Sequence, residues 1–387
     1  MNVLIAGNFP YPSGAASSAR IYNISKGFEA NNCKVWIIPY KKFEYPNDNL
    51  GGKDFGNVFY IENNSDPSQN LLTKSISWFQ YNSLLTNYIH EFILSHKIDL
   101  IYFYGESYFL INSILNKIKE LRIIKVLDIV EDRFKMVNIK NIIFDPLILD
   151  ILLGSNYLPR RMDLLCCISF GLFEKYKLYK RKLILSGIED FSRDLDLDYT
   201  ISKDIVNIIY LGALTERDNP DFLLFFLKKM KSNGIPVKLH LIGKYFKEIN
   251  SNKRALAIET EFPRMVILHG ELNNSQLISF CMNATFFLLP RLDNVAERMA
   301  FPTRVLEFIK FKKVIILEKV GDLDTYFKHM ENAFLFYKEE FNVEEFKLLI
   351  NSKSIQLQLI QNATNTGKQY FDRKSNIQKL IYAVKKI

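Results

Sequence analysis

The sequence predicts an α/β protein built from two doubly wound parallel-sheet domains. The chain has 387 residues, of which 48% are hydrophobic, so it can bury two cores of ordinary size. Buried strand runs alternate with amphipathic helices from the first residues onward. The same alternation starts again near residue 207, which indicates a second domain of the same kind.

The first predicted domain, residues 1–190, begins with a strand, a loop and a helix. Residues 3–7 read VLIAG, which is typical of a buried strand, and a turn-rich loop follows. In the next segment Ile21, Ile24 and Phe28 lie on one stripe of a predicted helix. Helical segments separate most of the later strand runs, at residues 34–40, 100–105, 125–130 and 164–169. Strands joined by helices pair in parallel, so we predict one parallel sheet here.

The second predicted domain, residues 206–368, repeats this order. A strand, a polar loop, an amphipathic helix and a new strand occupy residues 207–243. Later strand runs stand at residues 266–271, 284–290 and 314–321. Because ligands of such sheets bind beyond the carboxyl ends of the strands, we expect the site in a cleft between the two domains.

Two shorter segments complete the predicted organisation. Residues 191–205 are polar and lack apolar periodicity, so we predict that they form a linker. Residues 369–387 end in an amphipathic pattern, which predicts a terminal helix that crosses back to the first domain.

Charge, cysteine content and hydropathy exclude several kinds of protein. The net charge is +9, but the lysines are dispersed, so we do not expect a nucleic-acid partner. The four cysteines have no metal-ligand spacing, and the amino terminus lacks the long apolar core of a signal peptide. The most apolar stretch, residues 141–154, is interrupted by Asp145, Pro146 and Asp150 and is too short to span a bilayer. We therefore predict a cytoplasmic protein.

A membrane could still be a peripheral partner. Residues 141–158 are rich in apolar side chains and are followed by Arg160 and Arg161, a pattern that could touch the inner face of the cell membrane or a lipid-linked acceptor. A helix buried in the domain is the alternative, and the sequence favours it.

The helix predicted to start at Pro302 is a candidate anion site. Proline suits the first helical position, but the amides of Thr303, Arg304 and Val305 need acceptors. A phosphate would satisfy these amides, with help from the Arg304 side chain and the helix dipole. Glu307 would project from nearly the same face and could hold a hydroxyl-rich ligand. An ordinary helix with a hydrated first turn is an equally good interpretation.

Carboxylates follow two strands of the first domain. Glu106 stands after the strand run 100–105, and Asp128 and Asp132 stand at the end of the run 125–130. Such groups could orient an acceptor hydroxyl or a developing sugar cation. Ion pairing or loop capping is the alternative, and the sequence favours it for Asp128.

The order of several segments resembles that of a known enzyme family. SGAASSAR, LCCISFGLFEKY, IIYLGALTERDNPDFL, VILHGELNNSQL and LLPRLDNVAERMAFPTRVLEF follow one another along nearly the whole chain. This order resembles that of the retaining, nucleotide-sugar-dependent glycosyltransferases of the GT-B fold, family 4-like and known as group 1. The resemblance implies transfer of a sugar to a glycan or lipid-linked acceptor, as in bacterial surface polysaccharide or glycoconjugate synthesis.

The resemblance assigns the donor site in the second domain. It implies that Glu307 holds the donor ribose and that the helix start at Pro302, Thr303 and Arg304 binds the diphosphate. Arg217 is implied as the cation that neutralises the phosphates.

Two turns complete the implied nucleotide site. The loop at Gly14 and Ala15 is implied to let the backbone approach the phosphate and the acceptor, which also suits a glycine physically. The turn at Gly270, Glu271 and Leu272 is implied to receive the nucleotide base.

The sequence departs from the family pattern at two places. Met299 stands where the family often has a glutamate, so Glu297 is the candidate for the contact to the transferred sugar. Ala213 stands where an arginine is common, and the usual lysine is replaced by Asp218 or moved to Arg217. The identity of the donor sugar therefore stays open, as do the nucleotide base, the acceptor and the oligomeric state.

The chemistry implied for the site needs neither a metal ion nor a cofactor. Breaking the bond between sugar and diphosphate leaves negative charge on the phosphate, which the amides, Arg217 and Arg304 would stabilise. The Asp-x-Asp spacing within residues 194–198 falls in the predicted linker and is interpreted as a solvated charge run. The candidate catalytic residues are Arg217, Glu297, Asp132 and Glu106.

Three other functions are weighed against this one. A nicotinamide oxidoreductase is disfavoured because the first loop lacks the G-x-G-x-x-G pattern. A nucleotide-sugar epimerase has the same two-domain architecture and would act without an acceptor. A non-catalytic relative that only binds a nucleotide or a partner would fit the substitutions Met299 and Ala213.

Overall fold

The computed structural model describes residues 1–12, 16–40, 57–59, 71–132, 146–192, 205–243, 249–337 and 340–387, and side chains at most of these positions. The chain divides into two units. The first contains Met1–Asp190 together with Arg373–Ile387, and the second contains Phe191–Asp372. Most of the predicted linker, residues 193–204, lies outside the described residues.

The first unit is built on a seven-stranded parallel sheet of order β3-β2-β1-β4-β5-β6-β7. Its strands are β1 (Asn2–Gly7), β2 (Lys34–Pro39), β3 (Asn57–Val58), β4 (Leu100–Tyr104), β5 (Ile124–Ile129), β6 (Leu164–Cys167) and β7 (Lys182–Ile184). Its helices are α1 (Ala16–Glu29), α2 (Leu71–His96), α3 (Tyr108–Lys117), α5 (Pro146–Tyr157), η2 (Leu158–Arg161), α6 (Phe170–Lys175) and α15 (Arg373–Val384).

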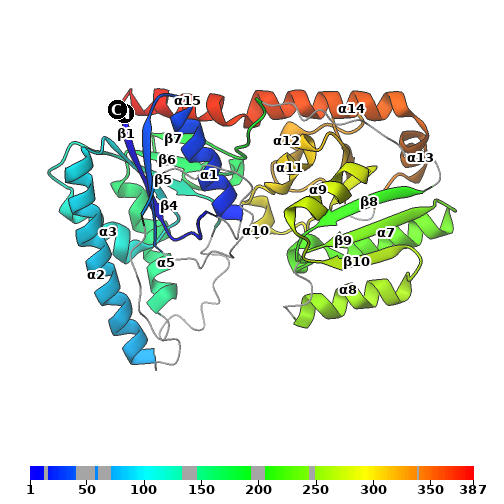
Figure 1. Ribbon diagram of the computed structural model, residues 1–387, viewed down its shortest axis with the longest axis horizontal. Coiled ribbons are helices and arrows are strands. Elements are labelled where there is room, and N and C mark those ends of the chain that lie inside the picture. The colour runs from blue at the N-terminus through cyan, green and yellow to red at the C-terminus, as the bar shows by residue number, and fades with distance from the viewer. Residues whose placement is uncertain are drawn as a thin grey trace. The chain divides into compact units, whose positions relative to one another are not determined.

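Helices cover both faces of this sheet, which explains why β4 is buried along its whole length and β1 is buried from Val3 onward. Figure 1 shows α1 and α15 on one side of the strands and α2 and α3 on the other. Ile21, Ile24 and Phe28 are fully buried in the core, so the predicted stripe of α1 is confirmed. Ile377 and Leu380 of the terminal helix pack in the same core.

A buried ion pair fixes α1 to the sheet. The Arg20 guanidinium donates to both oxygens of Asp128 at 2.8 Å, and neither side chain is more than 3% exposed. Arg20 also donates to the carbonyls of Leu185 and Ser186 at 2.7 and 2.6 Å. Asp128 therefore has the ion-pairing role that the sequence favours.

The second unit is built on a six-stranded parallel sheet of order β10-β9-β8-β11-β12-β13. Its strands are β8 (Val206–Leu211), β9 (Val237–Ile242), β10 (Val266–Gly270), β11 (Phe286–Leu289), β12 (Val314–Glu318) and β13 (Phe334–Phe336). Its helices are η3 (Glu216–Asp218), α7 (Pro220–Ser232), α8 (Ile249–Glu261), α9 (Asn274–Asn283), α10 (Val295–Arg298), α11 (Arg304–Lys310), α12 (Leu323–Tyr326), α13 (Val343–Asn351), α14 (Lys353–Thr366) and η4 (Gly367–Phe371).

The main core of the second unit lies between the sheet and α7, α8, α13 and α14. The opposite face of the sheet packs against α9 and α11, and Phe308 of α11 stacks on Phe287 of β11 with ring centroids 4.2 Å apart. The prediction of two α/β units with parallel sheets is confirmed.

The apolar segment around α5 contains a polar side chain with a structural role. Asp150 is 3% exposed and accepts a hydrogen bond from the Phe109 amide in the first turn of α3, at 2.8 Å. Residues 141–145 lie outside the described residues. In the part of the chain that the structure describes, no helix is both long and apolar enough to cross a bilayer.

Candidate functional site

Three neighbouring strands of the second unit end in glycines with positive φ. Gly212, Gly243 and Gly270 follow or end β8, β9 and β10, with φ values of 153°, 153° and 66°. The Gly212 amide donates to the Ile242 carbonyl at 2.9 Å, and the Gly243 amide donates to the Gly270 carbonyl at 2.8 Å. A Cβ atom at residue 243 would lie 2.0 Å from the Gly212 carbonyl oxygen. Close backbone packing at the carboxyl ends of these strands therefore requires glycine at residue 243.

The loop after β8 is a capping structure that presents Arg217. The Asp218 carboxylate accepts from the amide and the hydroxyl of Thr215, both at 2.9 Å. Asn219 adopts the left-handed conformation and caps α7, whose first residue is Pro220. Arg217 lies between these fixed residues, and its side chain is 38% exposed.

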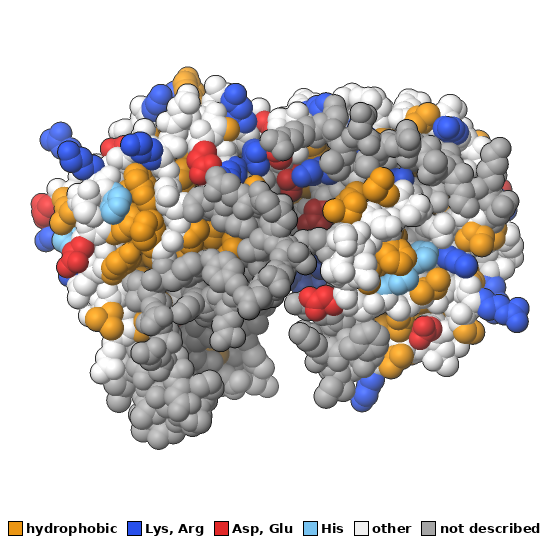
Figure 2. Space-filling model, viewed as in Figure 1, with side chains coloured by type: hydrophobic (Ala, Val, Ile, Leu, Met, Phe, Trp, Pro, Cys, Tyr) orange, Lys and Arg blue, Asp and Glu red, His pale blue; other side chains and the backbone are white. Residues whose placement is uncertain are grey.

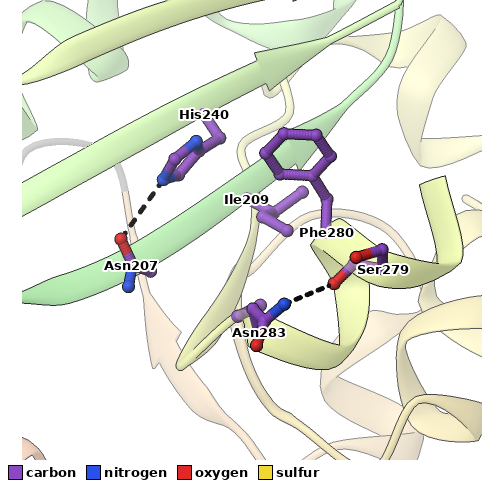
Figure 3. Close-up of a pocket in the computed structure, with 7 residues that line it drawn as sticks. Asn207, Ile209, His240, Ser279, Phe280 and Asn283 are labelled. Atoms are coloured by element: carbon purple, nitrogen blue, oxygen red, sulfur yellow. Dashed lines mark hydrogen bonds between the residues drawn. The ribbon is translucent and has the colours of Figure 1, made fainter. Parts of the chain in front are cut away.

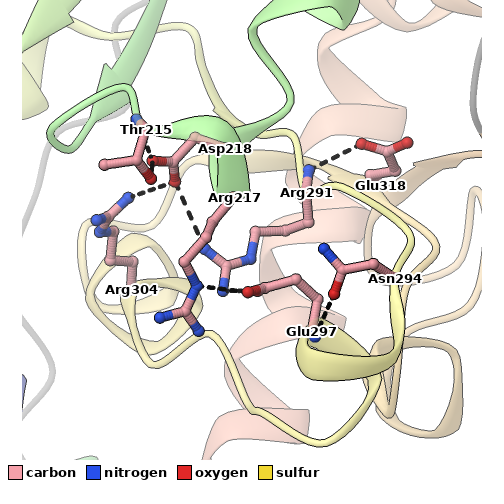
Figure 4. Close-up of polar contacts among 8 residues, drawn as sticks. All are labelled: Thr215, Arg217, Asp218, Arg291, Asn294, Glu297, Arg304 and Glu318. Atoms are coloured by element: carbon pink, nitrogen blue, oxygen red, sulfur yellow. Dashed lines mark hydrogen bonds and ion pairs between the residues drawn. The ribbon is translucent and has the colours of Figure 1, made fainter. Parts of the chain in front are cut away.

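The loop after β11 brings a second arginine and a carboxylate to the same place (Figure 4). Asn294 caps α10 by accepting from the Glu297 amide at 2.9 Å. The Glu297 carboxylate, 1% exposed, is held between the guanidinium groups of Arg217 and Arg291. The two loops are also joined directly, because the Leu292 amide donates to the Arg217 carbonyl at 3.0 Å. The sequence-predicted residues Arg217 and Glu297 are therefore direct partners.

Arg304 reaches this cluster from the start of α11. Its Nη1 lies 3.3 Å from Asp218 Oδ1, and its side chain is 34% exposed. The same nitrogen lies so close to Gly212 that a Cβ atom there would be 2.3 Å away. Burial alone would lower the pKa of Arg304, but the neighbouring Tyr210 and Asp218 outweigh this effect and raise it. The pKa of Tyr210 is raised by its own burial and by Asp218.

Asp218 is the negative centre between Arg304 and Arg291. Burial alone would raise the pKa of its carboxyl group, but Arg304, the Thr215 amide and Arg291 act against burial and lower it. Burial lowers the pKa of Arg291, while Glu297 and Asp218 oppose that shift. Three guanidinium groups meet the buried carboxylates of Asp218 and Glu297, and a third buried carboxylate, of Glu318, accepts from the Arg291 amide.

The helix start differs from the sequence-based hypothesis at one of the three amides, and the roles of the Thr303 and Arg304 amides stay a prediction. The Val305 amide, expected to be available for a phosphate, donates to the Pro302 carbonyl at 3.1 Å. The next amide, of Leu306, donates to Thr303 at 3.0 Å. The expectation for the Val305 amide is therefore wrong, because a tight turn at Pro302 uses it within the chain. The Glu307 side chain is exposed, three residues after Arg304.

The remaining donor-site candidates have different outcomes. Gly270 is buried at the end of β10, where Glu271 is exposed and Leu272 is half-buried. These residues follow the same sheet edge as Gly212 and Gly243. Gly14 and Ala15 lie outside the described residues. Their role, and that of the turn after β10, stays a prediction.

The carboxylate candidates of the first unit are both buried. Glu106 accepts from the Ser155 hydroxyl at 2.9 Å and from the Tyr176 hydroxyl at 3.3 Å. Asp132 accepts from Lys175 Nζ at 2.6 Å through one oxygen, while its other oxygen is buried and has no hydrogen-bond partner among the described residues. Both contacts also serve packing, so a role of either carboxylate in a reaction stays a prediction.

A separate pocket of about 310 Å³ lies between the sheet of the second unit and α9 (Figure 3). His240 Nδ1 lies 2.9 Å from His269 Nε2, and its Nε2 lies 3.2 Å from Asn207 Oδ1. Phe280 of α9 packs against His269, and the centroids of the two rings are 4.3 Å apart. In Figure 2, histidine atoms on the second unit lie beside hydrophobic side chains at the surface. Asn207 is near the amino end of β8, so this pocket lies away from Gly212 and the arginines.

Comparison with known proteins identifies the second unit. Residues 198–366 match the family model described as glycosyl transferases group 1. The second unit is a group 1 glycosyl transferase domain. This domain contains the arginine cluster, the three glycines and the pocket under α9. A search of curated protein sequences finds no significant match to the chain.

Solved structures extend the similarity beyond the glycosyl transferase domain. Sucrose-phosphate synthase from Thermosynechococcus elongatus has a TM-score of 0.70 at 11% identity, over 100% of this chain and 98% of that one. A glycosyltransferase from Rickettsia africae has a TM-score of 0.70 at 13% identity, again over 100% and 98%. Anabaena HepE, solved with UDP, has a TM-score of 0.71 at 15% identity, over 100% of both chains. The chain therefore has the GT-B fold, as predicted.

Three charged residues of the cluster were not chosen as site residues from the sequence. Asp218 appeared only as a departure from the family pattern, and Arg291 and Glu318 were not singled out. Glu318 ends β12 and accepts from the Arg291 amide at 2.8 Å and from the Asn219 side chain at 2.9 Å. The feature of the sequence that could have pointed to these residues is their position, since each follows or ends a buried strand at the carboxyl edge of the sheet.

Proposed function

We propose that the chain is a retaining glycosyltransferase that moves a sugar from a nucleotide-diphosphate sugar to a glycan or lipid-linked acceptor. The observation that carries this proposal is the pair of partly exposed guanidinium groups, Arg217 and Arg304, on the glycosyl transferase domain. Arg217 pairs with the buried Glu297 carboxylate and Arg304 with the buried Asp218 carboxylate, and these contacts fix the orientation of the two guanidinium groups. Such a pair suits the bidentate recognition of a diphosphate.

The arrangement supports catalysis through charge. When the bond from the sugar to the diphosphate breaks, negative charge grows on the leaving phosphate. Guanidinium groups fixed before the reaction stabilise this charge without the cost of reorganising. Such stabilisation does not require a metal ion, and we propose a reaction that proceeds without one. Glu307, exposed on α11, is the proposed contact for the donor ribose.

The first unit supplies candidate groups for the acceptor. Within the part of the chain that the structure describes, the second oxygen of Asp132 is buried without a hydrogen-bond partner, which is a costly state that an acceptor hydroxyl would relieve. Lys175 fixes the other oxygen at 2.6 Å and is itself partly exposed. We propose Asp132 as the acceptor-orienting residue and Glu106 as a support for this region. A cytoplasmic location, with contact to the inner face of the membrane, would suit a lipid-linked acceptor and surface polysaccharide synthesis.

Binding to a panel of nucleotide sugars tests the donor site. We expect the purified full chain to gain thermal stability with one group of these compounds. UDP-sugars come first in the panel, because Anabaena HepE was solved with UDP-glucose. Arg217→Ala and Arg304→Ala should each lower transfer about 100-fold, which is the usual effect of losing one charge-stabilising donor.

Arg298→Ala is the matched control for these two variants. Arg298 stands in the same loop region, is 58% exposed and pairs with Asp293 at 2.6 Å. It should keep transfer near the level of the unchanged protein. Full transfer by folded Arg217→Ala and Arg304→Ala proteins would refute the site. NMR of the first product formed would show whether the anomeric configuration is retained.

Two other outcomes would identify the alternative functions. Epimerised nucleotide sugar, or free sugar formed without an acceptor, would indicate the epimerase. Binding of nucleotide without turnover on any acceptor would indicate a non-catalytic relative, which the substitutions Met299 and Ala213 keep as an alternative.

A further inference from the structure

Arg291 is the most buried arginine of the cluster and the least suited to touch a ligand. Its side chain is 11% exposed, against 38% for Arg217 and 34% for Arg304. A guanidinium group carries five N–H donors and stays charged when buried. Placing this charge inside the domain is costly unless partners surround it. The partners of the Arg291 side chain therefore indicate which groups it positions.

The Arg291 side chain contacts two buried carboxylates of the cluster, those of Glu297 and Asp218 (Figure 4). One guanidinium nitrogen pairs with Glu297, and the other lies 3.5 Å from Asp218 Oδ1. Glu297 in turn holds Arg217, and Asp218 holds Arg304. The side chains thus form a continuous series, in the order Arg217, Glu297, Arg291, Asp218, Arg304.

The backbone at residue 291 is fixed as well. Its amide donates to Glu318 Oε2 at 2.8 Å, and Glu318 also accepts from the side chain of Asn219, at the start of α7. Arg291 therefore joins the loop after β8 to the loop after β11 through both its backbone and its side chain. A residue in this position can set the directions of both exposed guanidinium groups together.

We propose that Arg291 is a positioning residue for the diphosphate site, acting through Glu297 on Arg217 and through Asp218 on Arg304. This inference rests on the proposed function. Without Arg291, Glu297 and Asp218 each lose one of their cations, and Arg217 and Arg304 are the guanidinium groups of the cluster that still pair with them. The two exposed guanidinium groups would then turn inward toward the carboxylates and away from a phosphate.

A double-mutant cycle with inorganic pyrophosphate and UDP as the probes tests this proposal. Arg291→Gln should weaken binding of both probes about tenfold, which is the loss expected when a charged hydrogen-bonding group is misplaced. In an Arg217→Ala background the same change should have a smaller effect, because only its action on Arg304 through Asp218 is left. Residues that only stabilise the fold would give additive effects instead.

Two further variants keep the test decisive. Arg291→Lys retains the charge but cannot bridge both carboxylates, so it should also weaken binding of both probes. This variant takes the place of Arg291→Gln in the test if Arg291→Gln does not fold. Arg298 is an exposed arginine that pairs with Asp293, and the Arg298→Ala variant should bind both probes as the unchanged protein does.

The outcomes separate this inference from the proposed function. The positioning role alone would be overturned if the unchanged protein binds the probes and the cycle shows additive effects. It would also be overturned if the unchanged protein binds them and neither Arg291 variant changes binding. No binding of UDP or pyrophosphate by the unchanged protein would overturn the proposed function and this inference with it.

Discussion

Gly212 leaves the space that the Arg304 guanidinium group occupies. Its φ of 153° is one that other residues rarely adopt, and an added Cβ atom would lie 2.3 Å from Arg304 Nη1 and 2.6 Å from the Tyr210 hydroxyl. No side chain fits there unless Arg304 moves. The absence of a side chain at residue 212 is thus part of the site.

We therefore expect Gly212→Ala to weaken pyrophosphate binding about tenfold, since it displaces a charged donor. Backbone strain should also lower the free energy of unfolding by about 1 to 3 kcal/mol. Isothermal titration and chemical denaturation measure the two effects. Ala213→Ser, at the next position, is the control and should change neither. Unchanged binding by a folded Gly212→Ala protein would mean that Arg304 does not need its present position.

The residues of the cluster differ in how far the sequence reveals them. Arg217 and Arg304 could be chosen because a cation near a loop or helix start has an evident use with phosphate. Arg291 could not, because its function comes from contacts with Asp218 and Glu297, and Asp218 is 73 positions away in the sequence. Pairing across such a separation depends on the order of strands in the sheet, which one sequence does not contain.

Among the elements, the long buried strands and amphipathic helices were predictable because their burial leaves a clear pattern. Three short edge strands, β3, β7 and β13, were not predicted, since each has only two or three residues and little apolar periodicity. The start of α11 was predicted at Pro302, but its use of the Val305 amide was not. A turn that uses one of its amides within the chain looks the same in sequence as one that offers all of them to an anion.

The packing of α1 against α15 depends on a glycine. A Cβ atom at Gly27 would lie 2.5 Å from Ile377 Cγ1 and 2.9 Å from the Arg373 carbonyl oxygen. Gly27→Ala should therefore separate the two helices and lower the free energy of unfolding of the first unit by about 1 to 3 kcal/mol. Thermal and urea unfolding measure this loss.

Ala19→Ser, on the exposed side of the same helix, is the matched control and should cost little. Alanine is ordinarily a better helix former than glycine, so an unpacked surface at this position would make Gly27→Ala stabilising. A stabilised Gly27→Ala protein would show that the two helices do not pack this closely in solution.

At the scale of the whole molecule, stability should depend on pH through the histidine pair under α9. Burial, together with His269 and Lys238, lowers the pKa of His240 from 6.5 to about 4. Burial also lowers the pKa of His269. In the folded protein His240 is therefore neutral under conditions in which the unfolded chain already binds a proton.

This difference fixes the sign of the effect. Below pH 6.5 the unfolded state binds more protons at residue 240 than the folded state, so the free energy of unfolding falls as the pH drops from about 6.5 to about 4. His240→Gln should remove this contribution and reduce the loss of Tm between pH 7 and pH 5. The reduction should be modest, about 2 °C, because His240 is only partly buried and water screens its charge.

Differential scanning calorimetry at the two pH values measures this change, and the transition of the second unit is the one that should respond. Ser279→Ala, which alters the same pocket without a titrating group, should keep the full loss of Tm. An equal loss in His240→Gln and in the unchanged protein would mean that His240 takes up its proton in the folded state as readily as in the unfolded one. The pocket would then be open enough to hydrate the imidazolium, and the hydrogen bond between His240 and His269 would not persist in solution.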